Sequence, residues 1–154
     1  MMGFYTRLII FILINFGALW LGSLLQGVGS RSEWYQSLEI APWTPPGWVF
    51  GVAWFCIMLC FSVFMAYTLD LKAFNLLLLL VIFQLILNIG WNAVFFRYHL
   101  TGLSLIIILA LAIVVTVIFF MHVKTMTAKS LLVLPYVLWL FLAASLNWYV
   151  WIKN

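Results

Sequence analysis

The sequence predicts an all-α integral membrane protein, a single domain of residues 1–154 built as a bundle of five transmembrane helices. Of its 154 residues, 68% are hydrophobic and only 6% are charged, far from the composition of a soluble domain. The ten charged residues leave five uncharged runs, each long enough for a helix to cross a bilayer, which takes about 20 residues. The runs are Leu8–Ser30, Ile40–Leu69, Ala73–Phe96, Tyr98–Val123 and Ser130–Ile152. They are evenly apolar and do not alternate, which excludes the strands of a membrane β-barrel.

The five helices are expected at 6–27, 46–68, 73–96, 101–122 and 130–151, with a long first loop at 28–45. The first run is too long for the apolar region of a signal peptide and lacks a clean cleavage site, so we assign it as the first helix. An odd number of spans places the two termini on opposite sides of the membrane. Positive charges divide four to three between the two sides, which gives no usable orientation bias.

The junction between the first two helices, Trp34–Trp54, is rich in tryptophan and proline. Its centre reads Trp43-Thr44-Pro45-Pro46-Gly47-Trp48. Proline fixes φ and holds the preceding residue extended, so this connection is stiff. Thr44 is expected to cap the second helix, with Pro45 in its first turn. A stiff loop with aromatic side chains suits the rim of an apolar pocket, but tryptophans also gather at the membrane–water interface without any ligand.

Several chemistries are disfavoured by what the apolar runs lack. No Asp, Glu, Lys or Arg lies inside a predicted span away from its ends, whereas proton-coupled transporters need a buried ionisable relay. His99 and His122 fall near opposite ends of one helix, so they cannot share a metal, and we expect both at the membrane interface. Cys56 and Cys60 are too few for a zinc site, and no nucleophile–base pair is visible. We therefore expect no metal, no obligatory cofactor and no nucleic-acid partner, and we favour a non-enzymatic function.

Amide side chains form a stripe on the third helix. Gln84, Asn88 and Asn92 recur every four residues, and Trp91 lies alongside. Amides must face protein rather than hydrocarbon, and most serve as hydrogen-bond links between helices. The alternative is that they line an apolar pocket and orient a ligand.

The fifth helix carries a matching pattern. Trp139, Ala143 and Asn147 recur at the same spacing, and Tyr136 lies one turn before them. A small residue beside a tryptophan permits either tight helix packing or a space that a flat ligand could fill.

Three segments together resemble one membrane-protein family. The first is Trp34-Tyr35 … Pro42-Trp43-Thr44-Pro45-Pro46-Gly47-Trp48 … Trp54, and the second is Asn88-Ile89-Gly90-Trp91-Asn92-Ala93-Val94-Phe95-Phe96. The third is Pro135-Tyr136-Val137-Leu138-Trp139 … Ala143-Ala144 … Leu146-Asn147. In this order, and over essentially the whole chain, they resemble the tryptophan-rich sensory proteins. These are the bacterial relatives of the mitochondrial translocator protein, once called the peripheral benzodiazepine receptor.

The resemblance implies that the long first loop covers a ligand pocket within the five-helix bundle. The pocket residues that it implies are Trp54, Asn88, Trp91, Trp139, Ala143 and Asn147. The residues that it implies for the loop as a lid or hinge are Trp34, Tyr35, Trp43, Pro45, Pro46 and Trp48. Aromatic walls would supply contact area and stacking, while a few amides orient the ligand.

The same resemblance implies porphyrins such as protoporphyrin IX or haem as ligands, with sterols and benzodiazepine-type ligands as further candidates. It also implies a multi-pass protein of a bacterial cell membrane and a homodimer. Gly47 and Gly51 form a Gly-x-x-x-Gly pair that would permit a close helix contact. A proposed sterol motif, Leu146-x-x-Tyr149-x-x-x-Lys153, ends the fifth helix, but a similar pattern ends the second helix, so the motif discriminates poorly.

Three functions are compatible with the resemblance. The leading one is binding and sensing of porphyrins in the membrane, and the second is passive translocation of porphyrins or sterols. The third is light-dependent oxidative breakdown of bound protoporphyrin IX, for which Trp54 and Trp139 are the candidate reacting pair. The lack of ionisable groups in the spans argues only against coupled transport. The sequence therefore does not separate binding from passive movement.

Overall fold

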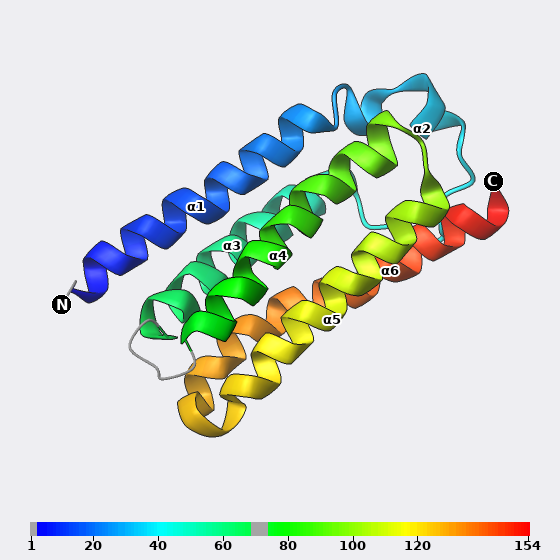
Figure 1. Ribbon diagram of the computed structural model, residues 1–154. Coiled ribbons are helices and arrows are strands. Elements are labelled where there is room, and N and C mark those ends of the chain that lie inside the picture. The colour runs from blue at the N-terminus through cyan, green and yellow to red at the C-terminus, as the bar shows by residue number, and fades with distance from the viewer. Residues whose placement is uncertain (1–2, 69–73) are drawn as a thin grey trace.

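The chain folds into helices joined by turns and one long loop (Figure 1). The computed structural model describes residues 3–68 and 74–154, and this part of the chain contains no β-strand. Its long helices are α1 (Phe4–Leu25), α3 (Gly47–Thr68), α4 (Phe74–Asn92), α5 (Thr101–Met126) and α6 (Leu134–Lys153). Its short elements are the 3-10 helices η1 (Gly29–Arg31) and η3 (Thr127–Val133), the helix α2 (Glu33–Ser37) and the π-helical turn η2 (Ala93–Arg97). The prediction of an all-α protein with five long helices is confirmed.

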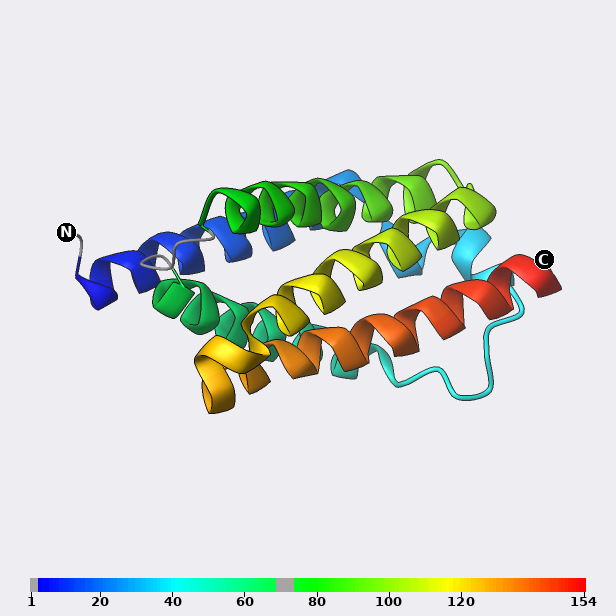
Figure 2. The same ribbon diagram turned by 60° about the horizontal axis from the view of Figure 1, so that its bottom comes forward.

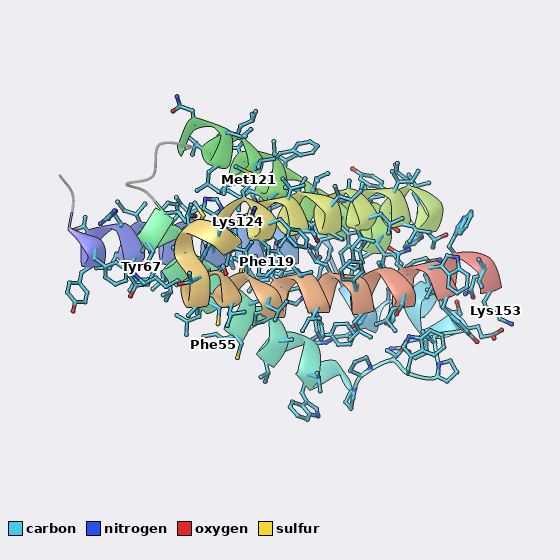
Figure 3. All side chains as sticks on the ribbon, turned by 90° about the horizontal axis from the view of Figure 1, so that it is seen from below. Phe55, Tyr67, Phe119, Met121, Lys124 and Lys153 are labelled. Carbon is cyan, nitrogen blue, oxygen red and sulfur yellow. The ribbon has the colours of Figure 1, made fainter. Side chains whose placement is uncertain are left out.

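Four continuous helical stretches in the described residues are long and apolar enough to cross a membrane. They are Phe4–Arg31, Gly47–Thr68, Asn75–Arg97 and Thr101–Lys153. The last has 53 residues because η3 joins α5 to α6 without a gap, and α5 and α6 fold back against each other (Figure 1). Lys124 and Lys153 mark opposite ends of the bundle in Figure 3. Asp70 and Lys72, predicted to lie in the second loop, fall outside the described residues.

The five long helices form a ring in the order α1, α3, α6, α5 and α4, and Figure 2 shows α4, α5 and α6 in succession. Two glycines let neighbouring helices approach closely. A Cβ on Gly22 of α1 would lie 2.9 Å from Asn92 Nδ2 of α4. A Cβ on Gly102 of α5 would lie 2.8 Å from Trp151 Nε1 of α6. Close approach matters in a bilayer, where helices associate through packing because lipid chains are as apolar as their own side chains.

The half of the bundle away from the first loop is solidly packed. Phe61, Phe64 and Met65 of α3 are fully buried in one cluster with Ile118 of α5 and Tyr136 of α6. The Phe61 ring lies edge-on to Tyr136 with the centroids 5.6 Å apart. This packed region stabilises the bundle, so the opposite half can contain a cavity.

The connection between α1 and α3, which we call loop one (residues 26–46), begins with two tight turns. Gly27 and Gly29 have φ values of +65° and +61°, the left-handed conformation that glycine adopts without strain. Ser32 then caps α2, because its hydroxyl accepts a hydrogen bond from the Tyr35 backbone N–H over 3.2 Å.

The end of loop one differs from the sequence prediction. The helix α3 begins at Gly47, and the backbone N–H of Val49 donates to the Pro46 carbonyl over 2.9 Å. Thr44 lies too early to cap this helix, and its own N–H instead closes a turn onto the Ala41 carbonyl over 2.9 Å. The prediction for Thr44 is therefore wrong, because Pro45 and Pro46 extend the chain before the helix starts.

Candidate ligand-binding cavity

A cavity of about 740 Å³ lies inside the ring of helices, on the side of loop one. All five long helices contribute to its wall, and loop one adds Gln26, Ser30, Tyr35, Ile40, Thr44 and Pro45. The six residues predicted for the pocket all line it: Trp54, Asn88, Trp91, Trp139, Ala143 and Asn147. The fold thus brings together residues of three helices that are distant in sequence, and their contact with a ligand stays a prediction.

Aromatic rings form much of the cavity wall. Trp91 stacks on Phe95 with the ring centroids 5.2 Å apart and the planes 12° from parallel. Trp139 lies edge-on to Phe50 with the centroids 5.3 Å apart. Because the rings support one another, they form a preformed apolar surface of the kind that binds flat organic ligands.

Asn147 lines the cavity, but its polar atoms already have protein partners. Its Oδ1 accepts hydrogen bonds from Trp91 Nε1 and from Ser104 Oγ, each over 3.0 Å. Its Nδ2 donates to the Thr101 carbonyl over 3.0 Å. Asn147 therefore ties α4, α5 and α6 together, which is the structural use of an amide that the sequence left open.

Asn88 has a different hydrogen-bonding state. Its Nδ2 donates to the Tyr136 hydroxyl over 3.0 Å, and Gln84 Nε2 donates to the same oxygen over 2.7 Å. Asn92 Nδ2 donates to the Asn88 backbone carbonyl over 2.9 Å. Within the described residues, no group donates to Asn88 Oδ1, so this oxygen is an amide acceptor that remains available in the cavity wall.

Two of the six predicted lid residues lie in the cavity wall. These are Tyr35 and Pro45, and the Tyr35 ring packs against Phe96 of η2 with the centroids 5.5 Å apart. Burial raises the pKa of the Tyr35 phenol, which therefore stays protonated and can donate a hydrogen bond. Loop one thus borders the cavity, and its role as a lid stays a prediction.

The other four predicted lid residues lie outside the cavity wall. Trp34 stacks on His99 with the centroids 3.9 Å apart and the planes 13° from parallel. Trp43 donates a hydrogen bond from Nε1 to α6 over 3.1 Å. Pro46 immediately precedes α3, and Trp48 is 71% exposed on its first turn. Trp48 therefore has the position expected of an interfacial tryptophan.

Glu39, which no sequence pattern singled out, fastens loop one to the C-terminal end of α6. Its backbone N–H donates to Asn154 Oδ1 over 2.9 Å, and the Tyr149 hydroxyl donates to its carboxylate over 3.0 Å. Lys153 Nζ lies 3.8 Å from the same carboxylate. We call these four residues the Glu39 latch. Two residues of the sterol motif, Tyr149 and Lys153, are thus engaged by loop one, while the third, Leu146, lines the cavity.

The two histidines occupy unlike positions. His122 is only 2% exposed, and its Nδ1 lies 2.8 Å from the Ile118 carbonyl oxygen. The expectation that its side chain extends to the membrane interface is wrong, because its ring packs edge-on to Phe64 inside the bundle, with the centroids 5.3 Å apart. His99 is exposed beside loop one. Over residues 3–68 and 74–154, no three His, Cys, Asp or Glu side chains lie close enough to hold a metal.

Known proteins with similar sequences point to one family. The chain is 32% identical over 131 residues to protein CrtK of Rhodobacter capsulatus, and the match covers 81% of each chain. It is 32% identical over 129 residues to the tryptophan-rich protein TspO of Archaeoglobus fulgidus, covering 81% of this chain and 82% of that one. It is 29% identical over 134 residues to the human translocator protein, covering 82% and 78%. Residues 10–152 match the TspO/MBR family, so this integral membrane protein belongs to the TspO/MBR family.

Proposed function

We propose that the protein binds a porphyrin, such as protoporphyrin IX or haem, in the cavity beneath loop one and acts as a membrane sensor for it. The observation that carries the proposal is that Trp54, Trp91 and Trp139 line one cavity of about 740 Å³. This volume lies within the range of roughly 300–1,000 Å³ that is typical of small-molecule sites. A flat macrocycle would gain stacking from several of these rings.

Two basic residues at the loop-one end of the bundle suit the acidic groups of a porphyrin. Arg31 and Arg97 are exposed on the neighbouring elements η1 and η2, and they directly follow Ser30 and Phe96, which line the cavity. The ligand's carboxylates would lie at this end, near water and the guanidinium groups. Its apolar body would occupy the space between the helices.

Binding is tested by titrating the purified protein with protoporphyrin IX and following tryptophan emission. We expect quenching with one site per chain, because the rings lie within contact of the ligand. Trp54→Leu should weaken binding, while Trp48→Leu, on the same helix but outside the cavity, should not. Equal effects of the two substitutions, or no quenching by the unsubstituted protein, would reject this site.

Passive translocation is a second use of the same cavity. A flux measurement in liposomes with porphyrin on one side separates the two functions. A sensor leaves the transbilayer rate unchanged, whereas a translocator raises it in proportion to the amount of protein. Sterol binding is less supported, because Tyr149 and Lys153 are engaged by Glu39.

Light-dependent oxidation is a third candidate, favoured by the presence of Trp54 and Trp139 on one cavity. An illuminated porphyrin produces oxidants from oxygen within reach of both rings. The double variant Trp54→Phe with Trp139→Phe should retain much of the binding but lose any product that free porphyrin does not give. The same product at the same rate per bound porphyrin would show that the tryptophans line the cavity but do not react.

A further inference from the structure

The ring of helices has one weak seam, between α3 and α6. These two helices pack far less extensively than any other neighbouring pair of long helices. Figure 3 shows α3, which carries Phe55, diverging from α6 as both run toward the end that bears Lys153. Near Ile57 and Pro135 the two helices are closer, and both line a shallow outer groove.

This groove lies on the outer face of the seam and has a volume of about 310 Å³. Ala53 and Cys56 of α3 and Trp139 and Leu142 of α6 are among its lining residues. Its lining is apolar, as expected of a surface that faces lipid chains. Trp139 also lines the inner cavity, so one side chain forms the wall between the two spaces.

Toward loop one, two glycines leave the seam between α3 and α6 without side-chain bulk. Gly47 and Gly51 both line the inner cavity and are both exposed at the protein surface. A Cβ added to either residue would meet no atom within 4 Å. Within the described chain this Gly-x-x-x-Gly pair therefore makes no close helix contact, and it borders open space.

The path through loop one, by contrast, is fastened at several points. The Glu39 latch holds the loop to the end of α6, and Trp43 Nε1 donates to Ser145 Oγ over 3.1 Å. On the other side of the loop, Trp34 stacks on His99. Opening this side would break hydrogen bonds and stacked rings together, whereas the ring contacts between α3 and α6 beside the cavity are edge-on aromatic pairs, Phe50 with Trp139 and Trp54 with Tyr136.

We propose that the cavity exchanges its ligand sideways with the bilayer, through the seam between α3 and α6, with Trp139 and Phe50 as the movable wall. The two rings meet edge-on across the seam, with the centroids 5.3 Å apart and an interplanar angle of 81°. The occupant of the outer groove is the same ligand, with its apolar macrocycle in transit from the lipid. A molecule that dissolves in the bilayer reaches this groove without crossing water. The inference rests on the proposed function, because it concerns access to that cavity.

The test fills the outer groove without touching the inner cavity. Ala53→Phe on α3 and Leu142→Trp on α6 both place bulk in the groove, and neither residue lines the inner cavity. Ala110→Phe and Leu109→Trp on α5 are matched controls, since both positions lie outside the groove and the cavity. Each protein is reconstituted in lipid nanodiscs, and protoporphyrin IX is delivered from vesicles that already contain it. Stopped-flow quenching of tryptophan emission gives the rates of ligand association and dissociation, and an equilibrium titration gives Kd.

We expect both groove variants to slow association and dissociation by about tenfold or more, as for a blocked gate, while Kd changes by less than about threefold. The unchanged Kd also shows that the variants are folded. Normal Kd with unchanged rates in the groove variants would overturn the sideways route, as would equal slowing in the controls. No binding by the unsubstituted protein would reject the proposed function, and with it the route.

Discussion

The two halves of the bundle use the same five helices in opposite ways. In the half away from loop one, large side chains such as Phe61, Phe64 and Met65 are fully buried and fill the interior. In the half beside loop one, rings of similar size line a cavity of about 740 Å³ without filling it. The difference lies in the positions of small residues, because Gly47, Gly51 and Ala143 all face the hollow side.

The contrast teaches how a membrane bundle can hold an empty space. Inside a bilayer the burial of apolar groups drives helices together only weakly, so packing must hold the bundle in shape. The dense half supplies that packing. The hollow half is kept open by rings that brace one another, such as Trp91 on Phe95, and by hydrogen bonds such as those of Asn147.

The largest expected effect comes from breaking the dense half. Phe61→Ala should lower the free energy of unfolding by about 3–5 kcal/mol, because it leaves a void in a fully packed region. Phe50→Ala, at the cavity, should cost only about 1 kcal/mol, since its ring has empty space on one side. Unfolding in detergent, followed by circular dichroism, measures both. Equal losses would mean that the two halves are packed alike.

A second prediction compares two neighbouring alanines. Ala143 lines the cavity, whereas Ala144 is buried in the core with 7% exposure. Ala143→Leu should weaken porphyrin binding by about tenfold, or 1.4 kcal/mol, and leave stability nearly unchanged. Ala144→Leu should instead destabilise the protein by about 1–3 kcal/mol through overpacking.

Titration with protoporphyrin IX and thermal unfolding together give the two readouts. If Ala143→Leu leaves both affinity and quenching unaltered in folded protein, the site between α4 and α6 is wrong.

A third prediction concerns loop one, which borders the hollow half. Glu39→Ala removes the carboxylate that binds Tyr149 and Lys153, so loop one should open more often. We expect its amides to exchange with deuterium about fivefold faster, a size typical of exposed polar contacts. Glu33→Ala, in the same loop but outside the latch, is the control. Protection of loop one that is the same in both variants would show that the latch does not hold it.

The smallest effect is expected from the proline pair. Pro45→Ala with Pro46→Ala should lower stability by about 1 kcal/mol at most, mainly by giving the unfolded chain more freedom. Deuterium exchange should rise only near the start of α3. A wider loss of protection, reaching the dense half, would show that the prolines determine more than the geometry of loop one.

Much of the cavity lining could be predicted through the resemblance to a family pattern. Trp54, Trp91 and Trp139 stood at positions that matched a family pattern, and the fold places all three on one cavity. The lid was harder to assign. Tyr35 and Pro45 border the cavity, whereas Trp34 and Trp43 lie elsewhere, because the path of an irregular loop is set by its distant contacts. Trp48 lies on the first turn of α3 and is exposed.

The sequence by itself determined the membrane class, the five long helices and the polar stripe on α4. These features depend on residues close in the chain, since an apolar run of sufficient length crosses a bilayer whatever its neighbours do. Only the tertiary structure decided that the Asn147 amide is hydrogen-bonded to other helices, whereas Asn88 Oδ1 accepts no hydrogen bond from the described residues. It also decided that Glu39 meets Tyr149 and that Gly51 faces a space. Each of these outcomes depends on helices that are distant in sequence, and their packing leaves no local trace in the pattern.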